Sequence, residues 1–136
     1  MKVLLVEDSA ALERSLRETL AEIEGVEVVH AAVSEPEAAR WLTEHPAEWD
    51  IAVIDIFLRE GHGFDVLRSC AERLPWQKAV VLTNYTREPA RSSAIKLGAD
   101  AVFDKSLELG EFLAYCASVA EQRSRGDSRD CRPAPR

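Results

Sequence analysis

The chain has 136 residues, of which 46% are hydrophobic, and a formal net charge of −7 at pH 7. This length suits one domain with an ordinary core, and no apolar run approaches the roughly 18 residues that a membrane span requires. Segment 122–136 holds five arginines against two aspartates, so it carries +3 and the remainder carries −10. An acidic domain argues against general nucleic-acid binding.

The cysteines Cys70, Cys116 and Cys131 share no close spacing, which indicates neither a disulfide framework nor a Cys-x-x-Cys motif. The sequence starts directly with a strand pattern, without a charged and then apolar leader. We therefore expect a reduced, cytoplasmic protein that is not exported and does not bind membranes.

Five apolar runs have the length of strands but lack the alternation that a half-exposed strand shows. Parallel strands covered by helices on both faces have this character. The runs are 3–6, 26–33, 51–56, 79–82 and 101–103. Apolar residues at helical spacing follow each run. These helical patterns span 12–23, 38–42, 67–74, 94–97 and 109–119.

Stop and start signals agree with this division. Ser34 and Glu37 form a capping-box pattern, Gly25 and Gly98 follow helical runs, and Pro75 closes another. Strand and helix thus alternate five times, and right-handed crossovers place helices on both faces of a parallel sheet. We predict the α/β class, a flavodoxin-like doubly wound sheet with strand order 2-1-3-4-5, where the order follows from the class rather than from residues.

The periodicity stops after about residue 121, where Arg, Ser, Gly, Asp and Pro dominate. We expect a domain at 1–121 and a disordered basic tail at 122–136. A solvated terminus is the simpler interpretation of this tail, and an electrostatic docking segment is the alternative.

Five polar residues stand where the predicted strands end: Glu7, Asp8, Asp55, Thr83 and Lys105. The carboxyl ends of parallel strands meet at one edge of a sheet, which is where open α/β sheets bind ligands. We therefore expect these side chains to gather in one crevice. Asp100 and Asp104 are interpreted as turn and surface residues.

The residue types in this crevice suggest metal-assisted phosphoryl chemistry. Three ionised carboxylates repel one another, and protonation or a divalent cation must relieve the repulsion. Oxygen ligands favour Mg²⁺, with Mn²⁺ as a second choice, over zinc. Lys105, the Thr83 hydroxyl and the Asn84 N–H can donate to phosphoryl oxygens, and Asp55 is a competent nucleophile that would form an acyl phosphate.

With Gly63 eight residues after Asp55, and Gly98-Ala99-Asp100 before the fifth strand, the chain resembles the response-regulator receiver domain of two-component signalling over about residues 1–120. The resemblance implies that Asp55 accepts phosphate from a sensor histidine kinase or a histidine phosphotransfer protein. It also implies that Thr83 and Lys105 report phosphorylation, and that the only catalysis is the chain's own phosphorylation and dephosphorylation. The implied ligands of Mg²⁺ are Glu7, Asp8, Asp55 and the backbone carbonyl of Phe57.

Ser106 departs from this family pattern, because receivers usually have a cis-bonded proline after the lysine. A cis bond before a residue other than proline costs about 3–4 kcal/mol. We predict either a trans bond with a shifted fifth helix or a strained cis bond held by the site. A second departure is Arg59, which replaces a proline and predicts a less rigid loop at 57–63.

A third departure concerns the switch, since Val102 stands where the family usually has Tyr or Phe. Phe103 should face the other side of its strand, so the hypotheses are that the switch rotation coupled to Thr83 is absent or that it uses Tyr85 instead. The resemblance also implies an output or dimerisation face that includes Val102 and Arg91. In the family, side chains at the positions of Phe57 and Tyr85 influence the access of water, and two aromatics there predict a long-lived phosphoryl group.

Three functions are weighed. The first is a stand-alone phosphorylated receiver, with no effector domain after the last helix, that signals through a protein partner or a phosphorelay, with a homodimer as one mode and without direct DNA binding. The second is a receiver-like module that binds a partner independently of phosphorylation. The third is a phosphohydrolase with an aspartate nucleophile, which lacks the expected second aspartate because Phe57 stands two residues after Asp55.

Overall fold

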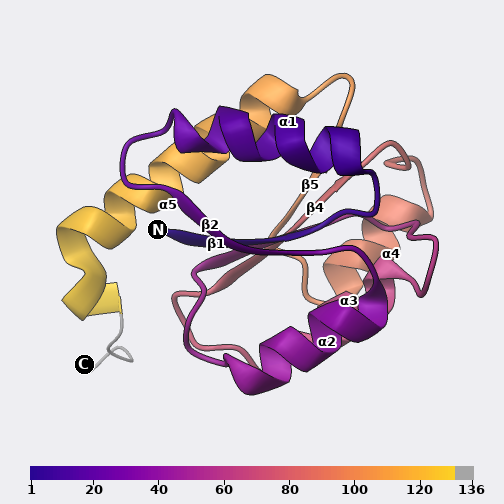
Figure 1. Cartoon of the computed structure of the whole chain (residues 1–136), viewed down its shortest axis with the longest axis horizontal. Helices are drawn as coiled ribbons and strands as arrows, with labels where there is room; N and C mark the ends of the chain where they lie inside the picture. Colours follow the sequence, from indigo (N-terminus) through magenta and orange to yellow (C-terminus); the bar gives the residue numbers. More distant parts are fainter. Residues whose placement is uncertain (131–136) are drawn as a thin grey trace.

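The computed structural model describes residues 1–130 and contains alternating strands and helices (Figure 1). The elements are β1 (Lys2–Val6), α1 (Ala10–Ala21), β2 (Glu27–Ala32), α2 (Glu35–Glu44), β3 (Ile51–Ile54), α3 (Gly63–Ser69), β4 (Lys78–Thr83), α4 (Ala90–Lys96), β5 (Ala101–Asp104) and α5 (Leu109–Asp130). Every predicted strand and helix is present, although β3 ends at Ile54, two residues before the end of the apolar run.

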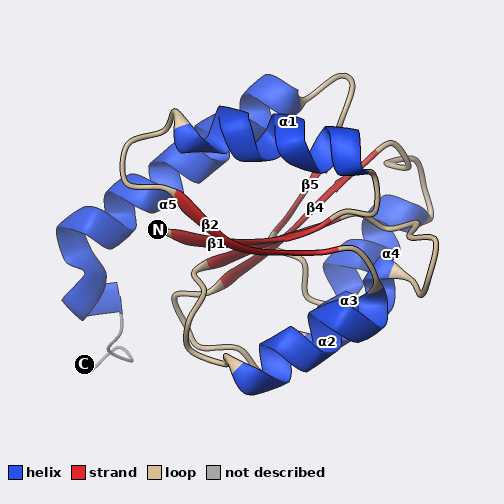
Figure 2. Cartoon of the chain, in the orientation of Figure 1, coloured by secondary structure: helices blue, strands red, loops and turns tan. Residues whose placement is uncertain are grey.

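The five strands form one parallel sheet in the order β2-β1-β3-β4-β5, which confirms the predicted fold class. Helices α1 and α5 cover one face, and α2, α3 and α4 cover the other (Figure 2). In β3, Ile51 and Val53 pack toward the first layer, while Ala52 and Ile54 pack toward the second. Both sides of the strand are buried, and this is why its sequence does not alternate.

The starts of α2 and α3 are fixed by local side-chain acceptors. Ser34 caps α2 by accepting from the Glu37 N–H at 3.3 Å, as the capping-box pattern predicts. The Glu37 carboxylate, however, accepts from the Val33 N–H at 3.2 Å, so the reciprocal half of the box is displaced by one residue. His62 caps α3 through Nδ1, which accepts from the Phe64 N–H at 3.1 Å.

Helix α5 continues to Asp130, so the domain boundary expected at residue 121 falls inside it. Arg123 anchors this extension through an ion pair with Asp50 (Nε to Oδ1, 3.1 Å) and lies over the Trp76 ring, 5.2 Å from its centroid. The rest of the predicted tail, 131–136, lies outside the described residues. No helix within 1–130 combines the length and the apolar character needed to span a bilayer.

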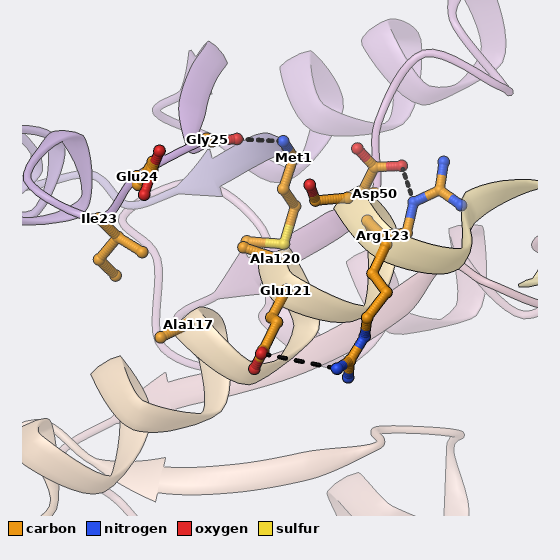
Figure 3. Close-up of a pocket in the computed structure, with 11 residues that line it drawn as sticks. Met1, Ile23, Glu24, Gly25, Asp50, Ala117, Ala120, Glu121 and Arg123 are labelled. Carbon is orange, nitrogen blue, oxygen red and sulfur yellow. Dashed lines mark hydrogen bonds and ion pairs between the residues drawn. The ribbon is translucent and has the colours of Figure 1, made fainter.

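A pocket of about 820 Å³ opens beside this anchor, at the edge where the strands begin (Figure 3). Asp50 joins three segments there, because its other oxygen accepts from the Lys2 N–H at 2.7 Å. The amino group of Met1 bonds to the Gly25 carbonyl on the opposite wall. The pocket therefore lies at the far end of the strands from the predicted phosphorylation site.

The thiols of Cys70 and Cys116 lie in the core, and burial raises the pKa of each to about 12, with the Arg73 charge partly offsetting this at Cys70. The thiolate is the reactive form. We predict that neither is alkylated by iodoacetamide in the native protein at pH 8, while both react in denaturant, as peptide mass spectrometry would show. Equal rates in the two conditions would contradict this burial.

Candidate active site

The carboxyl edge of the sheet brings together the residues that follow β1, β3 and β5. The ammonium of Lys105 donates to Glu7 Oε1 at 2.7 Å and to Asp55 Oδ2 at 3.0 Å. All three side chains are at most 13% exposed. Backbone bonds fix their positions, since the Glu7 N–H donates to the Ala32 carbonyl and the Asp55 N–H to the Val6 carbonyl.

Three carboxylates form the acidic part of this site. One oxygen from each of Glu7, Asp8 and Asp55 lies within 4.8 Å of the others. The Ser9 N–H donates to Glu7 Oε2 at 3.0 Å, and the Arg59 N–H donates to Asp8 Oδ2 at 2.6 Å. A backbone hydrogen bond therefore holds the loop that carries Arg59 to the acidic cluster, although this loop lacks the proline that receivers often have there.

Lys105 is the counter-charge of the cluster. Burial alone lowers its pKa, but the hydrogen bond with Glu7 and the charge of Asp55 outweigh this, and the net effect raises the pKa above its usual value. Lys105 is consequently a fixed cation throughout the physiological range. Lys105 balances one of the three carboxylate charges, and a divalent cation would balance the other two.

The donor set fits Mg²⁺ or Mn²⁺. Among the described residues, no hydrogen-bond donor reaches Oδ1 of Asp8 or Oδ1 of Asp55, so both oxygens are available as ligands. Oxygen donors in small number with open positions suit Mg²⁺, which retains several waters. Glu7, Asp8 and Asp55 thus fit the predicted ion, and the Phe57 carbonyl stays a prediction.

Thr83 ends β4 and is fully buried. Its hydroxyl accepts from the Tyr85 N–H at 3.2 Å, and its carbonyl accepts from the Lys105 N–H at 3.0 Å. The residue is thus next to Lys105 along the sheet edge, but its side chain contacts neither Lys105 nor Asp55 by a hydrogen bond in this structure.

Gly63 allows the loop after Asp55 to close tightly. Its N–H donates to the Ile56 carbonyl at 2.6 Å. A Cβ at this position would lie far inside contact distance of the Asp55 carbonyl oxygen and 2.8 Å from the Ile56 Cα. Only glycine permits this approach, which holds the backbone of Asp55 in place.

The bond between Lys105 and Ser106 is trans; the one cis bond in the described chain precedes Pro89. The predicted strained cis bond is therefore wrong, whereas the shift of the fifth helix that we expected with a trans bond stays a prediction. Lys105 reaches Asp55 Oδ2 at 3.0 Å across this trans bond. Ser106 makes two hydrogen bonds that a proline could not make. Its N–H donates to Asp104 Oδ1 at 2.8 Å, and its hydroxyl donates to Asn84 Oδ1 at 3.2 Å.

The proposed switch positions occupy different environments. Val102 is buried on the α4 side, whereas Phe103 packs on the opposite face against Phe112, as predicted. The Arg91 guanidinium donates to the Val102 carbonyl at 3.1 Å. Tyr85 is 56% exposed, so no aromatic side chain fills the buried switch position in this state.

Aromatic rings cluster in the loops that follow β3 and β4. The ring of Phe57 meets that of Tyr85 edge-on, with centroids 4.4 Å apart, and it meets His62 at 5.2 Å. His62 in turn meets Phe64 at 4.7 Å. Phe57 and Tyr85, the pair predicted to influence water access, are therefore in direct contact. The row of rings continues through His62 to Phe64 in α3.

Asp104 closes the turn after β5, which agrees with its interpretation as a turn residue, but sequence reasoning missed how many hydrogen bonds its carboxylate accepts. Hydrogen bonds from the backbone N–H groups of Leu107 and Ser106, with smaller contributions from Thr86 and Arg91, lower the pKa of its carboxyl group. The Asp-x-x-x-Glu spacing from Asp104 to Glu108 at the end of an apolar strand was the available signal, because such residues bond to nearby backbone.

Comparison with known proteins agrees with this geometry. The family model described as response regulator receiver domain matches residues 3–117. The DNA-binding transcriptional activator DevR/DosR of Mycobacterium tuberculosis is 33% identical over 130 residues, which cover 95% of this chain and 58% of that protein. The alginate biosynthesis transcriptional regulatory protein AlgB of Pseudomonas aeruginosa is 33% identical over 98 residues, covering 72% and 21%. The chain spans little more than half, or less, of these relatives.

Solved structures share the fold. The CheX-CheY-BeF3-Mg complex of Borrelia burgdorferi aligns with a TM-score of 0.78 at 23% identity, covering 88% of each chain. A LuxR-family two-component response regulator from Aurantimonas aligns with a TM-score of 0.78 at 21% identity, covering 96% of this chain and 94% of that one. With the match of its sequence over 3–117 and the site at its sheet edge, this chain belongs to the response regulator receiver domain family.

Proposed function

We propose that Asp55 accepts a phosphoryl group from a sensor histidine kinase or a histidine phosphotransfer protein, in a reaction that depends on Mg²⁺, and that the phosphorylated domain signals through a protein partner. The observation that carries this proposal is the placement of Lys105 Nζ between Glu7 and Asp55, beside three carboxylates with oxygens within 4.8 Å of one another.

In the proposed reaction each residue has one part of the chemistry. An oxygen of Asp55 attacks phosphorus, a P–O bond forms, and the bond to the donor nitrogen breaks with its electron pair leaving on the imidazole. Lys105 has three N–H donors and can turn one from Asp55 toward a phosphoryl oxygen. Glu7, Asp8 and Asp55 would hold Mg²⁺, which supplies positive charge to the phosphoryl oxygens. Water attack on the acyl phosphate releases inorganic phosphate and restores Asp55.

The output is proposed to be contact with a protein. The sequence up to residue 121 carries a net charge of −10, which does not favour direct binding to nucleic acid by this domain. The face near Arg91 and Val102, carried over from the family resemblance, is the proposed contact surface, with a homodimer as one mode. The reaction is confined to the chain's own phosphorylation and dephosphorylation, and the setting is proposed to be cytoplasmic.

Intact mass after incubation with Mg²⁺ and acetyl phosphate tests the proposal. We expect one phosphoryl adduct on wild type and none on Asp55→Asn or in the presence of EDTA. Asp65→Asn is the matched control, because Asp65 is exposed and forms its ion pair with Arg68 near the surface. An adduct retained in Asp55→Asn, or none on folded wild type across several phosphodonors, would overturn the proposal.

The second candidate is a module that binds its partner independently of phosphorylation. Val102 favours it, because the buried switch position holds no aromatic ring. Partner binding that is equal for wild type and Asp55→Asn, with and without phosphodonor, would select this function.

The contact between Phe57 and Tyr85 leads to a prediction about the lifetime of the phosphoryl group. Phe57→Ala removes one of the two rings predicted to influence the access of water, and we expect hydrolysis to accelerate about tenfold, equivalent to about 1.4 kcal/mol of barrier. The loss of the mass adduct after removal of phosphodonor measures this rate. Ile95→Ala removes a 49% exposed side chain on α4 and should leave the rate unchanged. Unchanged hydrolysis in Phe57→Ala would refute the prediction.

A further inference from the structure

Asp104 joins the two loops that leave β4 and β5. One of its oxygens, Oδ1, accepts from the N–H groups of Ser106 at 2.8 Å and Leu107 at 3.0 Å. The other, Oδ2, accepts from the Thr86 hydroxyl at 3.1 Å. A single carboxylate therefore closes the turn that contains Lys105 and ties that turn to the loop that follows Thr83.

A second set of bonds holds Asp104 itself. Its N–H donates to Glu108 Oε1 at 2.9 Å, and the Glu108 N–H donates back to the Asp104 carbonyl at 2.9 Å. Arg91 reaches the same Glu108 oxygen at 3.3 Å and the Thr86 carbonyl at 3.2 Å. This reciprocal pattern resembles a capping box and fixes the turn from both ends.

The turn has no proline to set its shape. Lys105 is followed by a trans bond and Ser106, yet its ammonium lies 3.0 Å from Asp55 Oδ2. Hydrogen bonds supply the constraint instead. The Lys105 N–H to the Thr83 carbonyl and the Ser106 hydroxyl to Asn84 hold the turn to the neighbouring loop, while Asp104 Oδ1 accepts from the N–H groups of both Ser106 and Leu107 within the turn. Side chains of adjacent strand residues point to opposite faces, so Asp104 acts on Lys105 through the backbone.

We propose that Asp104 is a positioning residue that aims Lys105 at Asp55 and couples the Lys105 turn to the loop after Thr83. This inference rests on the proposed phosphorylation of Asp55. A displacement of about 1 Å in a reacting group can cost on the order of 100-fold in rate. Loosening the turn should therefore slow phosphoryl transfer, while the carboxylates of Glu7, Asp8 and Asp55 stay in place and metal affinity is retained.

The experiment compares maximal phosphorylation rates at saturating acetyl phosphate with the Mg²⁺ dissociation constant from calorimetry. We expect Asp104→Ala to lower the maximal rate at least tenfold and to change the dissociation constant less than twofold. Asp104→Asn should recover the rate to within about threefold of wild type, because the amide oxygen still accepts from the turn and the amide nitrogen can donate to Thr86. A structural loss alone would not show this rescue.

Asp100→Ala is the matched control for stability. Asp100 also bridges segments, through Arg73 Nη2 at 2.9 Å and the Ala79 N–H at 2.8 Å, but at the opposite end of β5. Its rate should equal that of wild type while its unfolding midpoint falls. If Asp104→Ala does not fold, Thr86→Val removes only the hydroxyl donor and should still slow the reaction severalfold.

The outcomes separate this inference from the function on which it rests. Phosphorylated wild type together with an Asp104→Ala or Thr86→Val rate equal to wild type overturns the positioning role and leaves the proposed function standing. An Asp100→Ala rate as slow as that of Asp104→Ala also overturns the positioning role. The slow rate would then follow from a general loss of stability and not from the Lys105 turn. If wild type takes up no phosphoryl group, both the positioning role and the proposed function are overturned.

Discussion

Gly63→Ala is expected to destabilise the domain by about 3 kcal/mol and to slow phosphorylation of Asp55 at least tenfold. The added methyl group would overlap the Asp55 carbonyl oxygen and lie 2.8 Å from the Ile56 Cα, and both are backbone atoms that cannot rotate away. Overpacking of this kind forces the backbone to shift. The shift falls on the residue that accepts the phosphoryl group, so stability and rate should fall together. Urea unfolding and intact mass measure the two effects.

Gly110→Ala is the matched control for this substitution. Nothing lies within 4 Å of a Cβ at that position, and the residue belongs to α5. Alanine is favoured over glycine in helices by roughly 0.5–1 kcal/mol. The control should therefore be slightly more stable than wild type and equally reactive. A Gly63→Ala protein with wild-type stability would mean that the loop does not approach Asp55 as closely as described.

Lys105→Met is expected to lower the free energy of unfolding by about 3 kcal/mol in EDTA at pH 8. The change leaves Glu7 and Asp55, both at most 11% exposed, without their counter-charge. Removing one partner of a buried ion pair leaves an uncompensated charge. Mg²⁺ should restore more stability to this variant than to wild type, because the cation neutralises the same carboxylates. Thermal unfolding with and without Mg²⁺ measures this difference.

The pH dependence of this effect follows from the raised pKa of Lys105. A cation with a folded-state pKa above its unfolded value contributes fully below the unfolded pKa, about 10.4, and loses its contribution as pH rises through the folded value. The stability difference from wild type should thus be constant from pH 7 to 10 and shrink only above that range. Lys96→Met, at an exposed site on α4, should show no difference. Equal stability of wild type and Lys105→Met in EDTA would contradict the ion-pair assignment.

Most of the fold could be predicted because helices cover both faces of the sheet. Burial of β3 on both sides leaves an unbroken apolar run, and polar residues such as Asp55 and Lys105 then mark the strand ends. What could not be predicted depends on contacts between distant segments. The extension of α5 past residue 121 is held by Arg123 on Asp50, two residues 73 apart in sequence, and no local pattern encodes that pair.

The candidate site, like the fold, could be predicted only in part. The gathering of Glu7, Asp8, Asp55 and Lys105 at one sheet edge could be predicted from their places after the strands. The spacing of Asp104 and Glu108 signals bonds to nearby backbone, but the partners of Asp104 could not be predicted. Those partners depend on which backbone N–H groups a carboxylate meets after the turn has formed. The effect of Ser106 could not be predicted either, because the trans bond and the hydrogen bond to Asn84 depend on how the folded turn meets the neighbouring loop.

The anchor of α5 on Asp50 and Trp76 has a practical consequence for handling this protein. The helix runs back along the sheet and is pinned at the edge where the strands begin, whereas Asp55 lies at the edge where they end (Figure 1). A strand of five residues spans about 17 Å. A dye or a surface tether attached at the exposed Ser124 would therefore sit a full strand length from the chemistry. Molecules immobilised by that helix would present the Asp55 crevice to the solution, which suits them to single-molecule measurement of phosphoryl exchange.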